Sequence, residues 1–289
     1  MRVEKSFSRW RERRAERFGA ILFDIDGTLV SGRRTLPGAR ALLAELRRTR
    51  FPFCLLTNDG DHSPEEKSAL LAQRGLAVAA DEIVSCGAAL KPLADRRGYV
   101  GKTFFVMGRL GRPDFARRAG LRVVRDPAKI SGCHGVIVGE GTYNWQANIN
   151  AVANYFIERG PGGILLVPNP DSYWPADADG RIGIGAGAKA RFLCAILREY
   201  GTPVRPVYLG KPYRPVYRVA LTHLKRKYAL PPNCAGRNIL MLGDSLLSDI
   251  RGANRAGFSS GLLLTGITRP AHLTKAKGAL RPHWIFAGL

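Results

Sequence analysis

The sequence predicts an α/β protein: a three-layer core, in which helices cover both faces of a parallel β-sheet, with a second α/β domain inserted into it. Short, continuous apolar runs end abruptly in polar residues, as in strands buried on both faces of a parallel sheet. Helical patterns alternate with these runs, which favours right-handed crossover connections. The middle of the chain has an alternation of its own. We expect residues 1–85 and 206–289 to form the core and residues 86–205 to form the inserted domain.

The first half of the core is predicted from two apolar runs and the helical patterns after them. Residues 20–23 form the first strand, and the run at 51–56 forms a second strand that leads into Thr57. A helix over 37–49 begins with a proline, which the first turn of a helix tolerates. The next helix spans 63–75, because a serine, a proline and two acidic residues are typical of a helix start.

The remaining elements repeat this alternation. The inserted domain is expected to contain strands at 103–107, 135–138 and 164–167 and helices at 114–119 and 145–159. After a linker bounded by prolines, the core is expected to resume with a strand at 207–209, a helix at 215–228 and strands at 238–242 and 262–264.

Composition excludes several classes of protein. The 289 residues include 45 Lys and Arg against 23 Asp and Glu, a formal net charge of +22, and 45% are hydrophobic, too many for a disordered chain. No apolar run approaches the roughly 18 residues that a membrane span needs. The five scattered cysteines contain no Cys-x-x-Cys pair, so we expect reduced thiols and a soluble, cytoplasmic protein.

The positive charge is compatible with nucleic acid, an anionic membrane surface, small anionic substrates or a solvated basic surface. Residues 6–17 are expected to form a basic amphipathic helix, with arginine and glutamate residues separating the aromatic residues Phe7, Trp10 and Phe18. Such a helix can contact a membrane or a nucleic acid, but it more often packs on its own domain, and that is what we expect here.

Polar residues follow four of the predicted core strands. Because ligands of open parallel sheets bind at the carboxyl ends of the strands, we expect these side chains to meet at one edge. Hard oxygen ligands suit magnesium, and an ammonium and a hydroxyl suit phosphate oxygens. The residues are Asp24, Asp26, Thr57, Asn58, Lys211, Asp244 and Asp249.

Four motifs in the chain resemble those of the haloacid dehalogenase superfamily, in the same order. They are Asp24-Ile25-Asp26-Gly27-Thr28-Leu29, Leu56-Thr57-Asn58, Gly210-Lys211-Pro212 and the run Gly243-Asp244-Ser245-Leu246-Leu247-Ser248-Asp249-Ile250. The inserted segment looks like the cap of subfamily IIA, the branch of NagD-like and p-nitrophenyl phosphatase-like enzymes. The resemblance covers about residues 18–266 and implies a Rossmann-like core with an α/β cap.

The resemblance implies a role for each of these residues. Asp24 is then the nucleophile that forms an aspartyl-phosphate, and Asp26 protonates the leaving oxygen and later activates water. Magnesium is then held by Asp24, the backbone carbonyl of Asp26, and Asp244. Asp249 supports the metal shell or the ammonium of the third motif. The side chains of Thr57 and Lys211 then hold the phosphoryl group, and the backbone amides of Asn58 and Asp59 assist them.

Three features extend or depart from the family pattern. Asp59 stands where the branch often has a second asparagine, and it adds an acid near the phosphate site. Trp174 either stacks on a ring of the leaving group or packs the cap onto the core. Asn169 and Asp171 flank a proline, and they either close over the active site or form an ordinary turn, which is the interpretation we favour. The glycine-rich stretch 183–187 lacks the spacing of a nucleotide-binding loop.

The leading hypothesis is a magnesium-dependent phosphatase that acts on a small phosphorylated metabolite, such as a sugar phosphate or a nucleotide. One alternative is a phosphotransferase or mutase with the same intermediate, which the large cap makes less favoured. The other is a non-catalytic, basic nucleic-acid-binding protein on this scaffold. Because Asp24, Asp26, Lys211 and Asp244 are all present, nucleic acid is not the expected partner. A homodimer through the cap is a further expectation.

Overall fold

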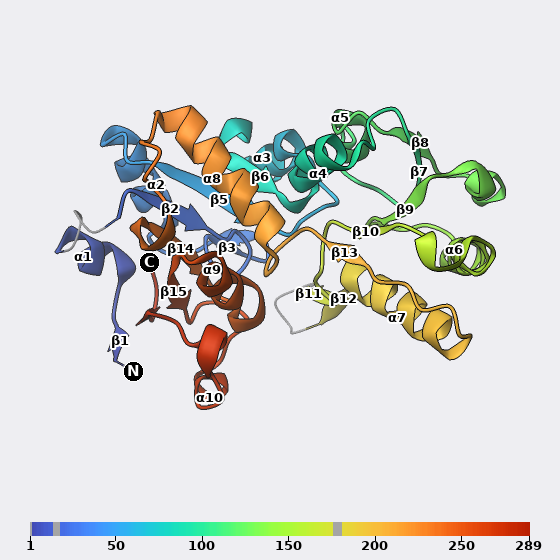
Figure 1. Ribbon diagram of the computed structural model, residues 1–289. Coiled ribbons are helices and arrows are strands. Elements are labelled where there is room, and N and C mark those ends of the chain that lie inside the picture. Colours follow the sequence, from blue (N-terminus) through green and yellow to red (C-terminus); the bar gives the residue numbers. More distant parts are fainter. Residues whose placement is uncertain (1, 14–17, 176–180) are drawn as a thin grey trace. The chain divides into compact units, whose positions relative to one another are not determined.

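The structure is a computed structural model that describes residues 2–13, 18–175 and 181–289 (Figure 1). The chain divides into two compact units, each with its own parallel sheet and hydrophobic core. The predicted α/β class is therefore confirmed. Unit 1 comprises Met1–Thr57, Lys67–Val84 and Lys211–Leu289, and unit 2 comprises Asn58–Glu66 and Ser85–Gly210.

Two segments that the sequence assigned to the core group with unit 2 instead. Residues 206–210 do so because β13 (Val207–Tyr208), expected as a core strand, pairs with β10 (Leu165–Val167). Residues 58–66 are the other segment. The hydroxyl of Ser85 donates to the carbonyl of Asp59 at 2.6 Å, and the hydroxyl of Ser63 donates to the carbonyl of Arg112 at 2.6 Å. These contacts hold the segment within unit 2. The assignment of the two units to a hydrolase core and a cap stays a prediction.

Unit 1 is built on a seven-stranded sheet in which every pairing from β1 through β5 is parallel. The two central strands, β14 and β2, carry the residues of the site at their carboxyl ends. In spatial order the strands are β1 (Val3–Glu4), β16 (Trp284–Phe286), β15 (Ser259–Leu263), β14 (Ile239–Gly243), β2 (Ala20–Phe23), β5 (Phe53–Thr57) and β6 (Ile83–Ser85).

Helices pack on both faces of this sheet. Alternate side chains of β2 point to opposite faces: Phe23 joins a core cluster with Leu42, whereas Leu22 joins a cluster with Ala220. The first face is covered by α1 (Phe7–Glu12), α2 (Ala39–Arg48) and α3 (Pro64–Gln73), and the second by α8 (Arg214–Tyr228) and α9 (Arg251–Ala256). The unit also contains the β3–β4 hairpin (Val30–Ser31, Arg34–Thr35), α10 (Pro270–Leu273) and a π-helical turn, η7 (Leu246–Ile250).

The basic N-terminal helix packs on its own unit, as expected. Helix α1 begins after Ser6, whose side chain accepts from the amide of Arg9 and donates to the carbonyl of Leu289. Phe7 and Trp10 are buried, and the Trp10 ring lies 5.2 Å from that of Trp284. The aromatic face is thus part of the core. Residues 14–17 of the predicted helix lie outside the described residues.

Unit 2 contains a five-stranded sheet with parallel pairings throughout. In spatial order the strands are β13 (Val207–Tyr208), β10 (Leu165–Val167), β9 (Gly135–Val138), β7 (Thr103–Met107) and β8 (Arg122–Val124). The α-helices of its described residues are α4 (Leu90–Arg97), α5 (Phe115–Arg118), α6 (Trp145–Arg159) and α7 (Ala186–Glu199). An antiparallel hairpin of β11 (Tyr173–Pro175) and β12 (Ile182–Ile184) completes the unit.

Two further observations bear on the composition-based expectations. Among the described residues no helix combines the length and the apolar character that crossing a membrane requires. All five cysteines are buried free thiols.

Candidate active site

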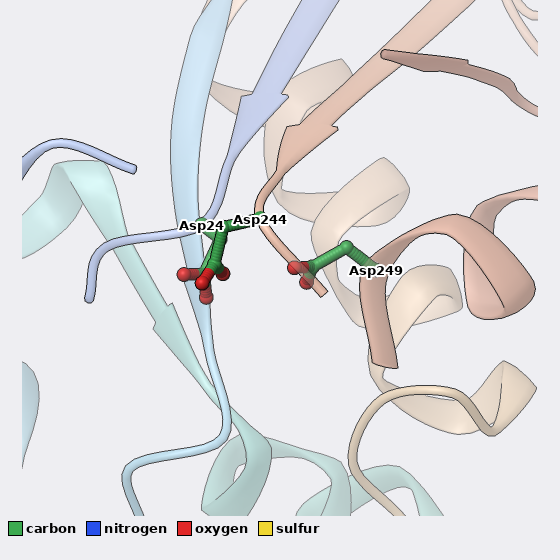
Figure 2. A group of neighbouring side chains, drawn as sticks. All are labelled: Asp24, Asp244 and Asp249. Atoms are coloured by element: carbon green, nitrogen blue, oxygen red, sulfur yellow. The ribbon is translucent and has the colours of Figure 1, made fainter. Parts of the chain in front are cut away.

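Three carboxylates meet at the carboxyl edge of the unit 1 sheet. Asp24 directly follows β2, Asp244 directly follows β14, and Asp249 lies in η7. One oxygen from each lies within 4.8 Å of the others, and all three residues are buried. Figure 2 shows the carboxylates of Asp24 and Asp244 side by side, with that of Asp249 turned toward them. The pairing of β14 with β2 produces this convergence, because it places both strand ends at one level.

Lys211 completes the cluster. Its side chain is 2% exposed, and its ammonium donates to Asp24 Oδ1 at 2.5 Å and to Asp249 Oδ1 at 2.7 Å. Burial lowers the pKa of Lys211, but the two carboxylates outweigh this and hold the pKa well above its usual range. The lysine is therefore a permanent cation in the site.

The electrostatics of the acids are dominated by burial. Burial raises the pKa of Asp24 well above its usual range, although Lys211 opposes the shift. Burial also raises the pKa of Asp244 to about 7, with the charge of Asp249 adding to the shift. Three carboxylates against one ammonium leave two negative charges uncompensated when all are ionised.

The donor set and its surroundings fit a divalent cation such as magnesium. Carboxylate oxygens are its preferred protein ligands, and the two uncompensated charges match its own. The backbone leaves room around Asp244: a Cβ on Gly27 or on Gly266 would lie 2.3 or 1.9 Å from Asp244 Oδ2. The amide of Ile267 donates to that same oxygen at 2.6 Å and so orients the carboxylate. Asp24, Asp244 and Asp249 could together hold such an ion.

Asp26 has partners that the sequence did not predict. Its carboxylate pairs with Lys67, at 2.9 Å, and with Arg74, at 3.3 Å. Lys67 lies on α3 and is almost fully buried, whereas the Asp26 side chain is 47% exposed. Lys67 and Arg74 are seven residues apart, the spacing that places two side chains on one face of a helix over two turns. This spacing was the sequence signal that the two could share one partner.

The second motif divides between the two units. Thr57 is buried at the end of β5 in unit 1. Asp59 caps a turn in unit 2, where its carboxylate accepts from the amides of Asp61 and His62 and contacts His62 Nδ1 at 2.9 Å. Its charge is therefore used in the turn. Asn58 Nδ2 donates to Asp171 Oδ2 at 3.0 Å.

Trp174 lies on the β11–β12 hairpin of unit 2 and is half-exposed. Its ring covers Gly183, where a Cβ would lie 2.3 Å from the indole. This contact explains one glycine of the stretch 183–187. The two predicted roles of Trp174, stacking on the leaving group and packing the cap, both stay predictions.

Comparison with known proteins gives family matches to two parts of the chain. A family model of haloacid dehalogenase-like hydrolases matches residues 21–122, and a second, described as HAD-hydrolase-like, matches residues 208–289. The first range contains Asp24 and Thr57, and the second contains Lys211 and Asp244.

Individual proteins match over most of their length. Chronophin of Mus musculus is 27% identical over 274 residues, which cover 91% of this chain and 88% of chronophin. The ribonucleotide monophosphatase NagD of Escherichia coli is 26% identical over 267 residues, covering 92% and 94%. A crystal structure of a glycerol phosphate phosphatase from Mycobacterium tuberculosis, in complex with magnesium, superposes with a TM-score of 0.76 at 25% identity and covers 94% of this chain and 75% of that one.

Proposed function

Because the chain belongs to the haloacid dehalogenase superfamily of hydrolases, in subfamily IIA, and is a phosphoric monoester hydrolase of that superfamily, we propose that it hydrolyses a small phosphomonoester through an aspartyl-phosphate on Asp24. The substrate class is a sugar phosphate, a nucleotide or a similar metabolite. The observation that carries the proposal is the buried cluster of Asp24, Lys211, Asp244 and Asp249 at the edge of the unit 1 sheet.

The proposed reaction has two steps in which Asp24 is first the nucleophile and then the leaving group. In the first step a carboxylate oxygen of Asp24 bonds to phosphorus, the ester P–O bond breaks, and Asp26 gives its proton to the leaving oxygen. In the second step Asp26 takes a proton from water, the water oxygen bonds to phosphorus, and the bond between Asp24 and phosphorus breaks. Phosphate is released, and both side chains regain their starting states.

Lys211 favours the attacking form of Asp24. A nucleophilic carboxylate must be ionised, and burial alone would keep Asp24 protonated. The ammonium at 2.5 Å counteracts this and, with Thr57, is placed to neutralise phosphoryl oxygens. Bound between Asp24, the Asp26 carbonyl and Asp244, magnesium would supply further positive charge, so that an anionic nucleophile meets a phosphate dianion with less repulsion.

Lys67 and Arg74 act on Asp26 in this proposal. Their two positive charges orient the half-exposed carboxylate, which gives up a proton in the first step and takes one from water in the second. We assign them as positioning residues.

Asp24→Asn tests the proposal. The amide is nearly the same size but is a poor nucleophile, so turnover of p-nitrophenyl phosphate is expected to fall by about 10⁴-fold or more. Asp95→Asn, the same change at an exposed residue of α4, is the matched control and should leave turnover unchanged. Chelation of magnesium should abolish activity reversibly. Undiminished hydrolysis by Asp24→Asn would overturn the proposal.

Phosphate release from a panel of metabolites would then identify the substrate class, and product analysis with a bisphosphate primer would reveal a mutase. Phe7 and Trp10 of the basic helix are buried rather than exposed for stacking on bases, which counts against the nucleic-acid alternative. A homodimer through unit 2 and a cytoplasmic location stay predictions.

A further inference from the structure

A second buried polar cluster lies in unit 2 and has no role in the proposed reaction. Glu140, Asn169 and Lys189 are each less than a tenth exposed. Glu140 Oε1 accepts from Asn169 Nδ2 at 2.7 Å, and Glu140 Oε2 lies 3.8 Å from the ammonium of Lys189. The ammonium also lies over the rings of Tyr143 and Trp145, at 5.0 and 5.2 Å. Lys189 and its neighbours hold Glu140 in place, and Glu140 in turn fixes the orientation of the Asn169 side-chain amide.

The Asn169 side chain in turn fixes the tight turn that follows it. Asn169 Oδ1 accepts from the amide of Asp171 at 2.8 Å, and the guanidinium of Arg191 donates to the carbonyl of Pro170 at 2.9 Å. The turn also packs on the start of α7. A Cβ on Gly185 or on Gly187 would lie 2.4 Å from the Asp171 carbonyl oxygen or 2.0 Å from that of Pro170. This close approach explains both glycines.

The amide of Ala186, between these glycines, donates to Glu140 Oε1 at 3.3 Å. One carboxylate thus holds both partners of this contact, the turn through Asn169 and the first residue of α7.

The turn contacts two residues that adjoin the phosphate-binding side chains in the sequence. Asp171 Oδ2 accepts from Asn58 Nδ2 at 3.0 Å, and Asn58 directly follows Thr57. In the segment that follows β13, the amide of Gly210 donates to the carbonyl of Pro168 at 2.8 Å, and Gly210 directly precedes Lys211. A Cβ on Gly210 would lie 2.5 Å from Asn58 Oδ1, so the two connections also touch each other.

We propose that Asp171 and Glu140 are positioning residues for phosphate binding, an inference that rests on the proposed function. They fix Asn58 and Gly210 and thereby the placement of Thr57 and Lys211. A buried ion pair contributes little net stability compared with well-packed apolar residues, whereas it fixes geometry. Glu140 and Lys189 orient Asn169, Asn169 orients Asp171, and Asp171 holds Asn58.

The experiment measures KM, kcat and inhibition by inorganic phosphate for Asp171→Ala and Glu140→Ala in the full chain with magnesium. A lost hydrogen bond in this chain weakens phosphate binding, so KM for p-nitrophenyl phosphate and the inhibition constant of phosphate should both rise about tenfold, with kcat changed by less. The same rise is expected for an alkyl phosphate, because the effect lies at the phosphate and not at the leaving group. Asp126→Ala, which removes a turn carboxylate elsewhere in unit 2, is the control and should leave these constants unchanged.

Two further variants separate positioning from a purely structural role. Glu140→Gln keeps an oxygen that can accept from Asn169, so it should restore near-normal KM. In a double-mutant cycle, Asp171→Ala should have little further effect once Asn58→Ala has removed the shared hydrogen bond. Asp171 is partly exposed, so its variant stays informative if Glu140→Ala fails to fold.

Three outcomes would each overturn the inference if the wild type is active. The first is that KM and the inhibition constant are unchanged in Asp171→Ala, the second is an effect confined to one leaving group, and the third is full additivity in the double-mutant cycle. A wild type without magnesium-dependent phosphatase activity would instead overturn the proposed function, so the two failures are distinguishable.

Discussion

The two units each bury a cluster of charged side chains, and the clusters differ in balance. In unit 1, Asp24, Asp244 and Asp249 share one ammonium, that of Lys211. In unit 2, one carboxylate faces one ammonium, and hydrogen bonds from an amide side chain and the backbone complete it. The balanced cluster is complete as it stands. The unbalanced one has a deficit of positive charge that a divalent cation would correct.

The pKa values make the same distinction. Burial raises the pKa of Asp244 and that of Glu140, each to about 7. The nearest charges then act in opposite directions: Asp249 raises the pKa of Asp244 further, whereas Lys189 lowers that of Glu140. The carboxylates of the two clusters therefore share a raised pKa for different reasons, and their charged neighbours distinguish them.

The largest expected effect comes from removing the ammonium of the unbalanced cluster. Lys211→Met leaves three buried carboxylates uncompensated, so without divalent cations the free energy of unfolding is expected to fall by about 3–5 kcal/mol. Lys189→Met leaves one buried carboxylate, that of Glu140, instead of three, so its loss of unfolding free energy is expected to be smaller. Urea unfolding followed by circular dichroism measures both variants, and equal losses would contradict the comparison.

The second effect is a pH dependence from Glu140. The folded pKa, about 7, lies above the unfolded value, so the stabilisation is fully present below about pH 4.5 and is lost as the pH rises through 7. Glu140→Gln does not titrate. The unfolding free energy of the wild type relative to this variant should therefore fall by at most about 3 kcal/mol between pH 4.5 and 8.5. A constant difference over that range would show that burial does not control this carboxylate.

The third effect is stabilisation by magnesium. A cation that binds only the folded state adds about 2.7 kcal/mol at a hundredfold excess over its Kd. We expect thermal unfolding to shift upward with magnesium in the wild type and not in Asp244→Asn. The variant alone should be more stable than the metal-free wild type, because it removes one of three clustered negative charges. A full magnesium response in Asp244→Asn would place the ion elsewhere.

The smallest effect is the reference for the others. Lys91 and Asp95 form an ion pair on α4 with both side chains about half exposed. Solvent screens such a pair, so Lys91→Ala is expected to change the unfolding free energy by about 0.5 kcal/mol or less, and raising the salt concentration should erase the difference. A loss of unfolding free energy as large as that of Lys211→Met would show that burial does not explain the difference between the exposed and the buried ion pairs.

The unit 1 site could be predicted from the sequence because apolar runs located the strand ends, and parallel pairing brings strand ends together. Thus Asp24 and Asp244, 220 residues apart in the numbering, were expected to meet, and they do. The pairing of Asp26 with Lys67 could not be read, because it depends on how α3 packs on the sheet. Glu140 lies two residues after the strand 135–138, much as Asp24 directly follows 20–23, so its place near a strand end was also visible in the sequence.

The missed elements are short or weakly patterned. Strand β8 has three residues, none of them fully buried, and the β11–β12 hairpin exposes most of its large side chains. Neither gives the continuous apolar run by which the other strands were found. Helix α7 begins in a glycine-rich stretch, which reads as a loop until the close packing on the Pro170 turn is seen.

The contact between Trp10 and Trp284 gives the molecule an optical reporter of its own. Indole rings 5.2 Å apart couple their electronic transitions, which produces a paired band in circular dichroism. The other two tryptophans, Trp145 and Trp174, belong to unit 2. A difference spectrum between the wild type and Trp10→Phe would therefore isolate the docking of the N-terminal helix. Thermal unfolding around the N-terminal helix could then be followed separately from that of the rest of the chain.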